Sequence, residues 1–380
     1  MPSPKNPFLT GSNLSPELYF GRDNEINRLI NEINSGNNVS LLGPSKIGKK
    51  SLINSAFANR EIGRNYYTFF IDIRTTRTMG EFVLLLSKTI LEALKPFGKN
   101  VYEEYINSIV SLKSYIIYDS RDIPYLNLSL DKIDNEGITL DEIFNFLDET
   151  GKPCIVAIDE FQQISNYPGK NILNTIRTYV QHCKSARFIF SGSRVSEMEK
   201  IFVKQASPFY QSTSVITLEA IPANIYSAFA FRQFTENGFE ISADVIFAIF
   251  EKFEGVTWYM QKVLNTIYNN AIKGTICTLE MLPDAIAETL DCYDYTYSDL
   301  MLRIPEKQKE LLVAISKEGK VNGITSGSFV KKYNLPSQSS VQAALKGLLE
   351  KDYIIRTTNP DTKASIYFLT DKFLELWLNK

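Results

Sequence analysis

Short apolar runs alternate with longer amphipathic stretches through the first half of the chain. Five runs have the length of strands and lie at residues 38–42, 67–73, 154–158, 187–191 and 213–218. The segments between them repeat apolar positions at the spacing of helices, most clearly at residues 51–59, 80–94 and 172–183. Strands that alternate with helices predict an α/β core, with a five-stranded parallel sheet covered on both faces. Residues 99–149 look inserted between the second and third strands, and they predict helical segments and polar turns.

The pattern changes after residue 218. Residues 219–300 place apolar positions at helical spacing and contain no convincing strand, which predicts a small helical domain. Residues 301–380 predict three helices and then two strands around a turn, at 306–318, 326–333, 339–351, 353–357 and 366–369, with the turn at Asn359-Pro360-Asp361. Three helices followed by a hairpin predict a winged helix-turn-helix. We therefore expect a core over residues 1–218 with an insertion at 99–149, a helical domain over 219–300 and a winged helix over 301–380.

Composition and charge narrow the class of protein. The chain has 380 residues, 44% hydrophobic and 22% charged, which is typical of a globular protein of two to three domains. A net charge of −2 argues against a chain that coats nucleic acid along its whole length. Residues 301–380 differ, because 13 Lys and Arg against 8 Asp and Glu give them a net charge of +5. A positive charge is expected of a domain that binds DNA, although this one is modest.

Metal, thiol and membrane functions find little support in the sequence. The four cysteines form no C-x-x-C pair, which argues against a zinc ribbon or a thioredoxin-like motif. The sole histidine, His182, leaves no multi-histidine metal site, and with Cys183 it is expected to end an ordinary helix. No run approaches 18 apolar residues, and the first residues show no apolar signal core, so we expect a cytoplasmic protein without a membrane span.

A phosphate-binding loop follows the first predicted strand. A P-loop has the pattern G-x-x-x-x-G-K-[ST] between a strand and a helix, where backbone N–H groups, the lysine and the helix N-terminus attract phosphate oxygens. The segment here meets every requirement but one, since Lys50 stands where a hydroxyl normally ligates Mg²⁺ and Ser51 comes one residue too late. The pattern is strong for phosphate and weaker for Mg²⁺-dependent hydrolysis. The residues expected to bind the nucleotide are Gly43, Pro44, Ser45, Lys46, Ile47, Gly48, Lys49, Lys50 and Ser51.

Two later strand ends carry the partner chemistry. The apolar run 154–158 ends in Asp159-Glu160, a Walker B pattern in which the aspartate holds the metal and the glutamate polarises the attacking water. Glu160 supplies what hydrolysis needs, whereas Lys50 removes one metal ligand, so the sequence leaves hydrolysis open. The run 187–191 ends in Ser191-Gly192-Ser193, and a hydroxyl there can contact the terminal phosphate or the attacking water.

These motifs resemble the AAA+/STAND superfamily of P-loop ATPases, and within it the archaeal-type ATPases, which are similar to origin-recognition initiators. Asn6-Pro7-Phe8 and the segment 20–26 look like the family's N-terminal box, and the segment 48–52 looks like its G-K-T-S-L, with Lys50 in place of the threonine. The segment 255–261 looks like the lid motif but lacks the sensor 2 arginine. The resemblance covers nearly the whole chain apart from the insertion. It implies an ASCE P-loop core, a helical lid and a C-terminal winged helix.

The resemblance also implies residue roles. Gly43, Gly48 and Lys49 would bind the phosphates of ATP or ADP, and Asp159 would hold Mg²⁺. Glu160 would be the catalytic base and Ser193 the sensor. Arg22 would border the base or ribose, although a helix-capping salt bridge explains it equally well.

Three functions stay open at this point. The first is an ATP-binding molecular switch with weak hydrolysis, in which the nucleotide state controls the lid and the winged helix. The second is a hydrolysis-deficient nucleotide-binding protein that recruits DNA or a protein partner. The third is a sequence-specific regulator in which the nucleotide is only structural. In the predicted recognition helix, Gln342 could read adenine and Ser339 or Ser340 could meet phosphate. A second copy of the chain is a further candidate partner, and no membrane is expected.

Overall fold

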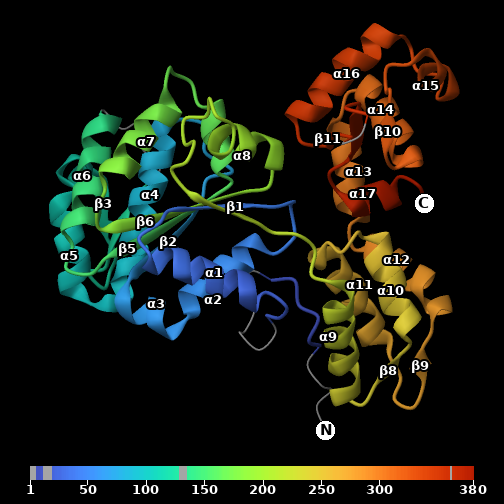
Figure 1. Ribbon diagram of the computed structural model, residues 1–380, viewed down its shortest axis with the longest axis horizontal. Helices are drawn as coiled ribbons and strands as arrows, with labels where there is room; N and C mark the ends of the chain where they lie inside the picture. Colours follow the sequence, from blue (N-terminus) through green and yellow to red (C-terminus); the bar gives the residue numbers. More distant parts are fainter. Residues whose placement is uncertain (1–5, 12–18, 128–134, 360–361) are drawn as a thin grey trace. The chain divides into compact units, whose positions relative to one another are not determined.

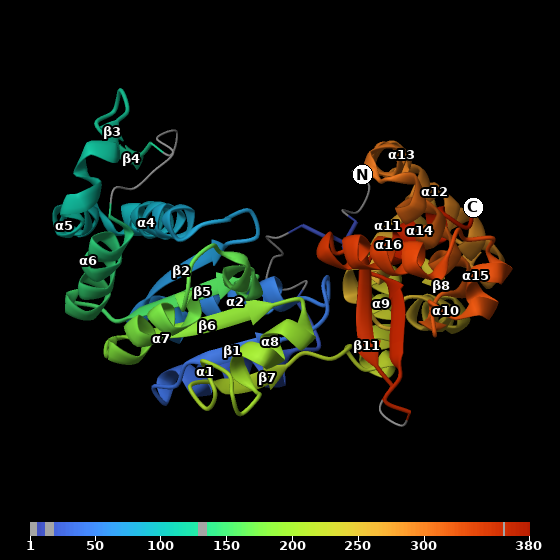
Figure 2. The ribbon, with the colours of Figure 1, turned by 90° about the horizontal axis from the view of Figure 1, so that it is seen from above.

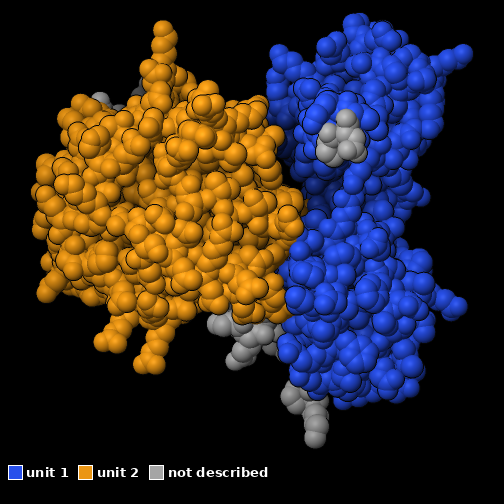
Figure 3. Space-filling view, in the orientation of Figure 1, with its two compact units in different colours: residues 1–11, 220–380 blue, residues 12–219 orange. Residues whose placement is uncertain are grey.

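The computed structural model describes residues 6–11, 19–127, 135–359 and 362–380. The chain divides into two compact units, coloured separately in Figure 3. Unit 2 comprises Ser12–Glu219, and unit 1 comprises Met1–Gly11 together with Ala220–Lys380. The division falls one residue after the predicted end of the core, and it places the predicted helical domain, the winged helix and the N-terminal segment in one unit.

The described part of unit 2 is built on a five-stranded parallel sheet, as the alternation of strands and helices predicts. Its order is β2-β5-β6-β1-β7. The inner strand β5 is buried at all six positions, because side chains that alternate between the faces meet helices on both sides. The strands are β1 (Val39–Leu42), β2 (Tyr67–Asp72), β5 (Cys154–Asp159), β6 (Ala186–Gly192) and β7 (Ser214–Thr217).

Helices cover the sheet on both faces (Figures 1 and 2). Ile155 and Ala157 of β5 join a core with α1 (Asp23–Asn34) and α2 (Lys49–Ala58). Val156 and Ile158 join the opposite core. The remaining helices of unit 2 are α3 (Arg60–Asn65), α4 (Met79–Leu94), α5 (Lys99–Ser108), α6 (Glu136–Glu149), α7 (Ile172–His182) and α8 (Val195–Phe202). His182 ends α7 as expected, and its Nδ1 lies 2.7 Å from the carbonyl oxygen of Thr178.

The predicted insertion is partly different from its prediction. Its helices α5 and α6 are present, and α6 packs on α4 as part of the core. A hairpin of β3 (Ile116–Tyr118) and β4 (Pro124–Leu126) lies between them, where polar turns were predicted. Each strand has three residues, which is too short for an alternation to stand out in the sequence. Residues 128–134 lie outside the described part of the chain.

The first part of unit 1 is helical, with a small sheet that the sequence did not predict. The prediction of no strand between residues 219 and 300 is wrong, because β8 (Glu240–Ile241) pairs in parallel with β9 (Ile276–Cys277). Two residues per strand leave no periodic signal. The helices are α9 (Ala223–Glu236), α10 (Ala243–Lys252), α11 (Thr257–Asn270), α12 (Leu282–Asp291) and α13 (Asp294–Arg303).

The N-terminal segment belongs to this helical part. Phe8 is fully buried, with its ring centroid 5.3 Å from that of Phe234 and 5.8 Å from that of Tyr268. Two side-chain to main-chain hydrogen bonds tie the segment to α11: Asn6 Nδ2 donates to Asn265 O, and Asn265 Nδ2 donates to Phe8 O. The two halves of the N-terminal box therefore separate, with Asn6-Pro7-Phe8 in unit 1 and Arg22 in unit 2.

The C-terminal part is a winged helix, as predicted. A third strand, β10, pairs with β12 and was not predicted, because it has two residues. Pro360 and Asp361 of the predicted turn lie outside the described residues. The elements are α14 (Glu306–Glu318), β10 (Val321–Asn322), α15 (Gly327–Lys332), α16 (Gln338–Glu350), β11 (Ile354–Thr358), β12 (Ser365–Leu369) and α17 (Lys372–Trp377).

One carboxylate joins the helical part of unit 1 to the winged helix. Asp371 caps α17 and accepts hydrogen bonds from the hydroxyls of Tyr259 on α11 and Tyr297 on α13. The ring of Phe373 packs against Tyr259 at a centroid distance of 4.9 Å. Aromatic burial around a fully bonded carboxylate makes this joint stable, so the helical part and the winged helix form one body.

Candidate active site

The predicted P-loop leaves the carboxyl end of β1 and runs into α2. Gly48, with a φ of 107°, caps the helix in a backbone conformation that favours glycine. Gly43 is needed for space, because a Cβ there would lie 2.9 Å from the carbonyl oxygen of Leu218. Ile47 is buried in the core and anchors the loop. The structure therefore explains why both positions of the motif are glycine.

Lys49 begins α2 and is 7% exposed. Its Nζ donates to the carbonyl oxygens of Gly43 at 2.7 Å and Pro44 at 2.8 Å, so the ammonium lies inside the loop. Burial lowers the pKa of Lys49 to about 8, although the carboxylates of Glu160 and Asp159 act in the opposite direction. A phosphate group in the loop would stabilise the charged ammonium and reverse this shift.

This position of Lys49 predicts a pH-dependent affinity for phosphate ligands. The free protein loses the Lys49 proton as the pH rises through about 8, whereas the bound form needs the charge. ATP affinity should therefore fall about 20-fold between pH 7.5 and pH 9.5, with proton uptake on binding. Titration calorimetry in two buffers of different ionisation enthalpy measures both the affinity for ATP and the number of protons taken up. The Lys50→Ala protein should show the same dependence, and an affinity constant over this range would contradict the prediction.

Lys50 stands at the position of the usual P-loop hydroxyl. Its Nζ lies over the ring of Phe70 on β2, 5.0 Å from the centroid, and the side chain is exposed. An ammonium cannot ligate a cation, so no group at residue 50 serves the metal. Ser51, one residue further along α2, is half-buried.

Asp159 ends β5 at the same edge of the sheet and is 6% exposed. Ser191 Oγ donates to its Oδ1 at 2.5 Å, and Asp72 of the neighbouring strand lies opposite it in register. Burial is the main cause of the raised pKa of Asp159, partly offset by the Ser191 hydrogen bond. Its second oxygen and the phosphates of a nucleotide suit Mg²⁺, which prefers one or two carboxylates with waters and phosphate. Among the described residues, no cluster of three acidic, cysteine or histidine side chains could hold a metal alone.

Glu160 follows in a left-handed conformation, with a φ of 58°. Its Oε2 accepts from Ser193 Oγ at 2.7 Å and from Gln162 Nε2 at 2.5 Å, and its Oε1 accepts from Arg74 at 3.0 Å. Burial would raise the pKa of Glu160, but these hydrogen bonds and the charge of Arg74 outweigh it and lower the pKa. Glu160 is therefore held as a carboxylate.

The predicted residues do not all converge. The structure brings Lys49, Asp159, Glu160 and Ser193 together and divides the two predicted hydroxyls, because Ser191 serves Asp159 and Ser193 serves Glu160. Pro44 is exposed, while Ser45 and Lys46 are half-buried in the loop. Sequence analysis missed Arg74 and Gln162, although they lie only two and three residues after the ends of β2 and β5.

Arg22 lies beneath the P-loop and is 4% exposed. Its guanidinium pairs with Glu25 at 2.8 Å. It also donates to the carbonyl oxygens of Glu219 at 2.5 Å and Ile47 at 3.5 Å. One guanidinium therefore links the nucleotide-binding loop with the last residue of unit 2.

Comparisons with known protein families agree with this geometry. Residues 19–263 match the family described as an ATPase domain predominantly from Archaea, and the chain belongs to this family. Residues 295–380 match a probable winged helix domain. The chain is thus an archaeal-type P-loop ATPase with a C-terminal winged helix, as the sequence motifs suggested.

Individual relatives are distant. An uncharacterized ATP-binding protein of Methanocaldococcus jannaschii is 26% identical over 159 residues, which are 38% of this chain and 44% of the relative. The chain thus matches less than half the length of that curated relative. Among solved structures, the Walker-type ATPase PABY2304 of Pyrococcus abyssi has a TM-score of 0.62 and 18% identity, covering 98% of this chain and 100% of the other. The Aeropyrum pernix ORC1 protein in complex with DNA has a TM-score of 0.55 and 12% identity, covering 98% and 94%. At these identities the structural matches show the fold alone.

No helix within the described residues is both long enough and apolar enough to cross a bilayer.

Proposed function

We propose that this protein is an ATP-binding molecular switch that hydrolyses ATP slowly with the help of Mg²⁺. The observation that carries the proposal is the convergence of Lys49, Asp159 and Glu160 at the carboxyl edge of one parallel sheet. The loop 43–48 and the start of α2 would receive the phosphates of ATP or ADP. Asp159 would hold the metal, Glu160 would orient the attacking water, and Ser193 would hold Glu160 in place.

Slow hydrolysis follows from the metal site. Because Lys50 supplies no ligand, the metal would depend on Asp159, water and the phosphates, which leaves it weakly held. Glu160 is meanwhile engaged by Arg74 and has a lowered pKa, so it is a weak base until that ion pair opens. The hydrolysis-deficient alternative is the limit in which the ion pair does not open at all.

A switch also needs a link from the nucleotide to the rest of the chain. Arg22 supplies one, since it contacts the P-loop at Ile47 and the chain at Glu219, directly before unit 1 begins. Unit 1 would respond as one body because Asp371 joins its helical part to the winged helix. ATP and ADP would then favour different arrangements of a pre-existing equilibrium.

The test is nucleotide binding and turnover by the purified full chain. Calorimetry should show saturable binding of ATP and ADP, and Mg²⁺ should be required for phosphate release. Absence of binding to either nucleotide would reject the switch. Saturable binding without phosphate release would select the hydrolysis-deficient alternative.

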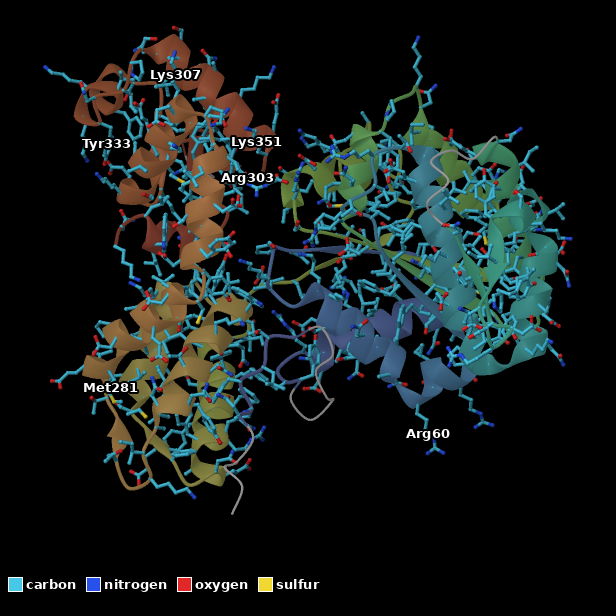
Figure 4. The ribbon with its side chains drawn as sticks, turned by 180° about the vertical axis from the view of Figure 1, so that it is seen from behind. Arg60, Met281, Arg303, Lys307, Tyr333 and Lys351 are labelled. Atoms are coloured by element: carbon cyan, nitrogen blue, oxygen red, sulfur yellow. The ribbon has the colours of Figure 1, made fainter. Side chains whose placement is uncertain are left out.

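DNA is a second proposed partner, supported by the exposed face of α16. Val341, Leu345 and Leu348 pack inward, while Gln342 and Lys346 are exposed on the other face. Further cations lie nearby on the winged helix, and Figure 4 shows Lys307 and Lys351 at its surface. A helix of this kind could enter the major groove of duplex DNA.

DNA binding would be electrostatic and therefore sensitive to salt. We expect weak binding of duplex DNA at 50 mM salt, measured by fluorescence anisotropy, with affinity lost as salt rises. Lys346→Ala should lower the slope of log affinity against log salt by about one. Lys332→Ala is the control, because Lys332 lies on α15 and is held by Glu318, whereas Lys346 on α16 has only a long, exposed ion pair with Glu350 at 3.8 Å. No binding at low salt would remove DNA and favour a protein partner or a second copy of the chain.

A further inference from the structure

The turn after β5 carries a buried glutamine close to the proposed catalytic base. Gln162 lies in η4 (Phe161–Asn166), two residues after Glu160, and is 4% exposed. Its Nε2 donates to Glu160 Oε2 at 2.5 Å, and Ser193 Oγ donates to the same oxygen at 2.7 Å. The reverse orientation of the amide would set two oxygen atoms against each other, so the carboxylate fixes which way Gln162 faces. Within the described residues, its own Oε1 is buried and has no hydrogen-bond partner.

The amide of Gln162 occupies a notch next to a glycine. A Cβ on residue 192 would lie 2.3 Å from Gln162 Oε1 and 2.5 Å from Met198 Sδ, and Met198 is itself fully buried. The φ angle of Gly192 lies outside the left-handed region, so its backbone conformation does not call for glycine. Residue 192 therefore appears as glycine for a spatial reason, which is to leave room for the amide and the methionine.

We propose that Gln162 is a positioning residue for the Glu160 carboxylate, and that Gly192 keeps open the space which its amide needs. The inference rests on the proposed function, in which Glu160 orients the attacking water. Two buried donors on Oε2 fix the plane of the carboxylate. Its other oxygen, Oε1, faces Arg74, whose side chain is 66% exposed. Oε1 is thus the oxygen that can exchange its partner for water, while Oε2 stays held.

The variant that tests this is Gln162→Met, which keeps the length of the side chain and removes the donor. We expect kcat for ATP to fall about tenfold with KM unchanged, because the base is less well oriented in the transition state. The acidic limb of the pH–rate profile should move to higher pH, since the carboxylate loses a donor that favours its charged form. Gln163→Met is the matched control, because Gln163 Nε2 donates to the Thr76 carbonyl oxygen at 2.9 Å instead. Gln163→Met should change neither kcat nor the pH of the acidic limb.

Gly192→Ala provides an independent second variant. Its methyl group should displace the amide and reproduce the effects of Gln162→Met, and adding it to Gln162→Met should change little further. Crystal structures of the nucleotide-free variants give a readout that needs no turnover. The Glu160 carboxylate should be rotated from its wild-type position in both variants and unmoved in Gln163→Met.

The outcomes separate the two proposals. A Glu160 carboxylate that keeps its wild-type position in Gln162→Met would overturn the positioning role, whatever the turnover. Turnover that is unaffected by Glu160→Gln would instead reject Glu160 as the base, and the crystal structure of Gln162→Met would still decide whether Gln162 holds the carboxylate.

Discussion

Replacing Lys49 with alanine should lower the affinity for ATP at least 100-fold. The Lys49 ammonium is buried inside the P-loop and donates to Gly43 O and Pro44 O. In the complex it would exchange these carbonyls for phosphate oxygens in the same low-dielectric surroundings. Hydrogen bonds between charged groups contribute about 1.5–3 kcal/mol each, and 2.7 kcal/mol corresponds to about 100-fold in affinity. Calorimetric titration of ATP and ADP at pH 7 measures the loss.

The neighbouring lysine is the matched control for this experiment. Lys50 follows directly in sequence, carries the same charge and lies over Phe70 at the surface. Lys50→Ala should change the affinity for ATP less than about threefold, because solvent and salt screen the charge of an exposed cation. Equal losses of ATP affinity in the two variants would indicate that ATP responds to the net charge of the protein and does not bind in the P-loop. Unchanged affinity in Lys49→Ala would reject the phosphate site.

Replacing Glu160 with glutamine should abolish most of the turnover while leaving nucleotide binding intact. Glutamine keeps the shape of the side chain but cannot accept a proton from water. General-base catalysis typically contributes 10²–10⁴-fold, so we expect kcat to fall about 1,000-fold. ATP affinity should stay within about threefold, since Glu160 lies beyond the loop that receives the phosphates. Steady-state phosphate release with Mg²⁺ gives kcat, and calorimetry gives the affinity.

Glu197→Gln is a suitable comparison for Glu160→Gln. Glu197 lies on α8, is 36% exposed and pairs with Arg194 at 3.2 Å. Its substitution should leave kcat unchanged, because a surface ion pair contributes little to either folding or chemistry. Residual phosphate release at the wild-type rate in Glu160→Gln would show that another group activates the water.

Prediction from sequence succeeded where a feature is written in contiguous residues. The strand β5 is a short apolar run with turn signals at both ends, and the P-loop is a spacing of glycines and a lysine. Very short strands were not predicted, because they contain too few contiguous residues to show a pattern. The strands β8 and β9 have two residues each, so no period exists to detect, and they form through contacts made by the helices around them.

The surroundings of the site depended on contacts between distant segments. Arg74 reaches Glu160 because β2 and β5 are neighbours in register, with Asp72 opposite Asp159. The spacing of Ser191 and Ser193 does not say which carboxylate each hydroxyl serves, since that depends on how the ends of β5 and β6 are aligned.

The sequence by itself determined the class of protein and the order of its longer helices and strands, and it predicts which residues bind phosphate, because these follow from local periodicity and side-chain chemistry. Only the tertiary structure decided that Lys50 stacks on Phe70 and that Phe8 belongs to unit 1. It likewise decided that Gln162 and Arg74 hold the two oxygens of Glu160. The physical reason is that a side chain's partner is chosen by strand register and packing between segments far apart in the chain, which no local pattern records.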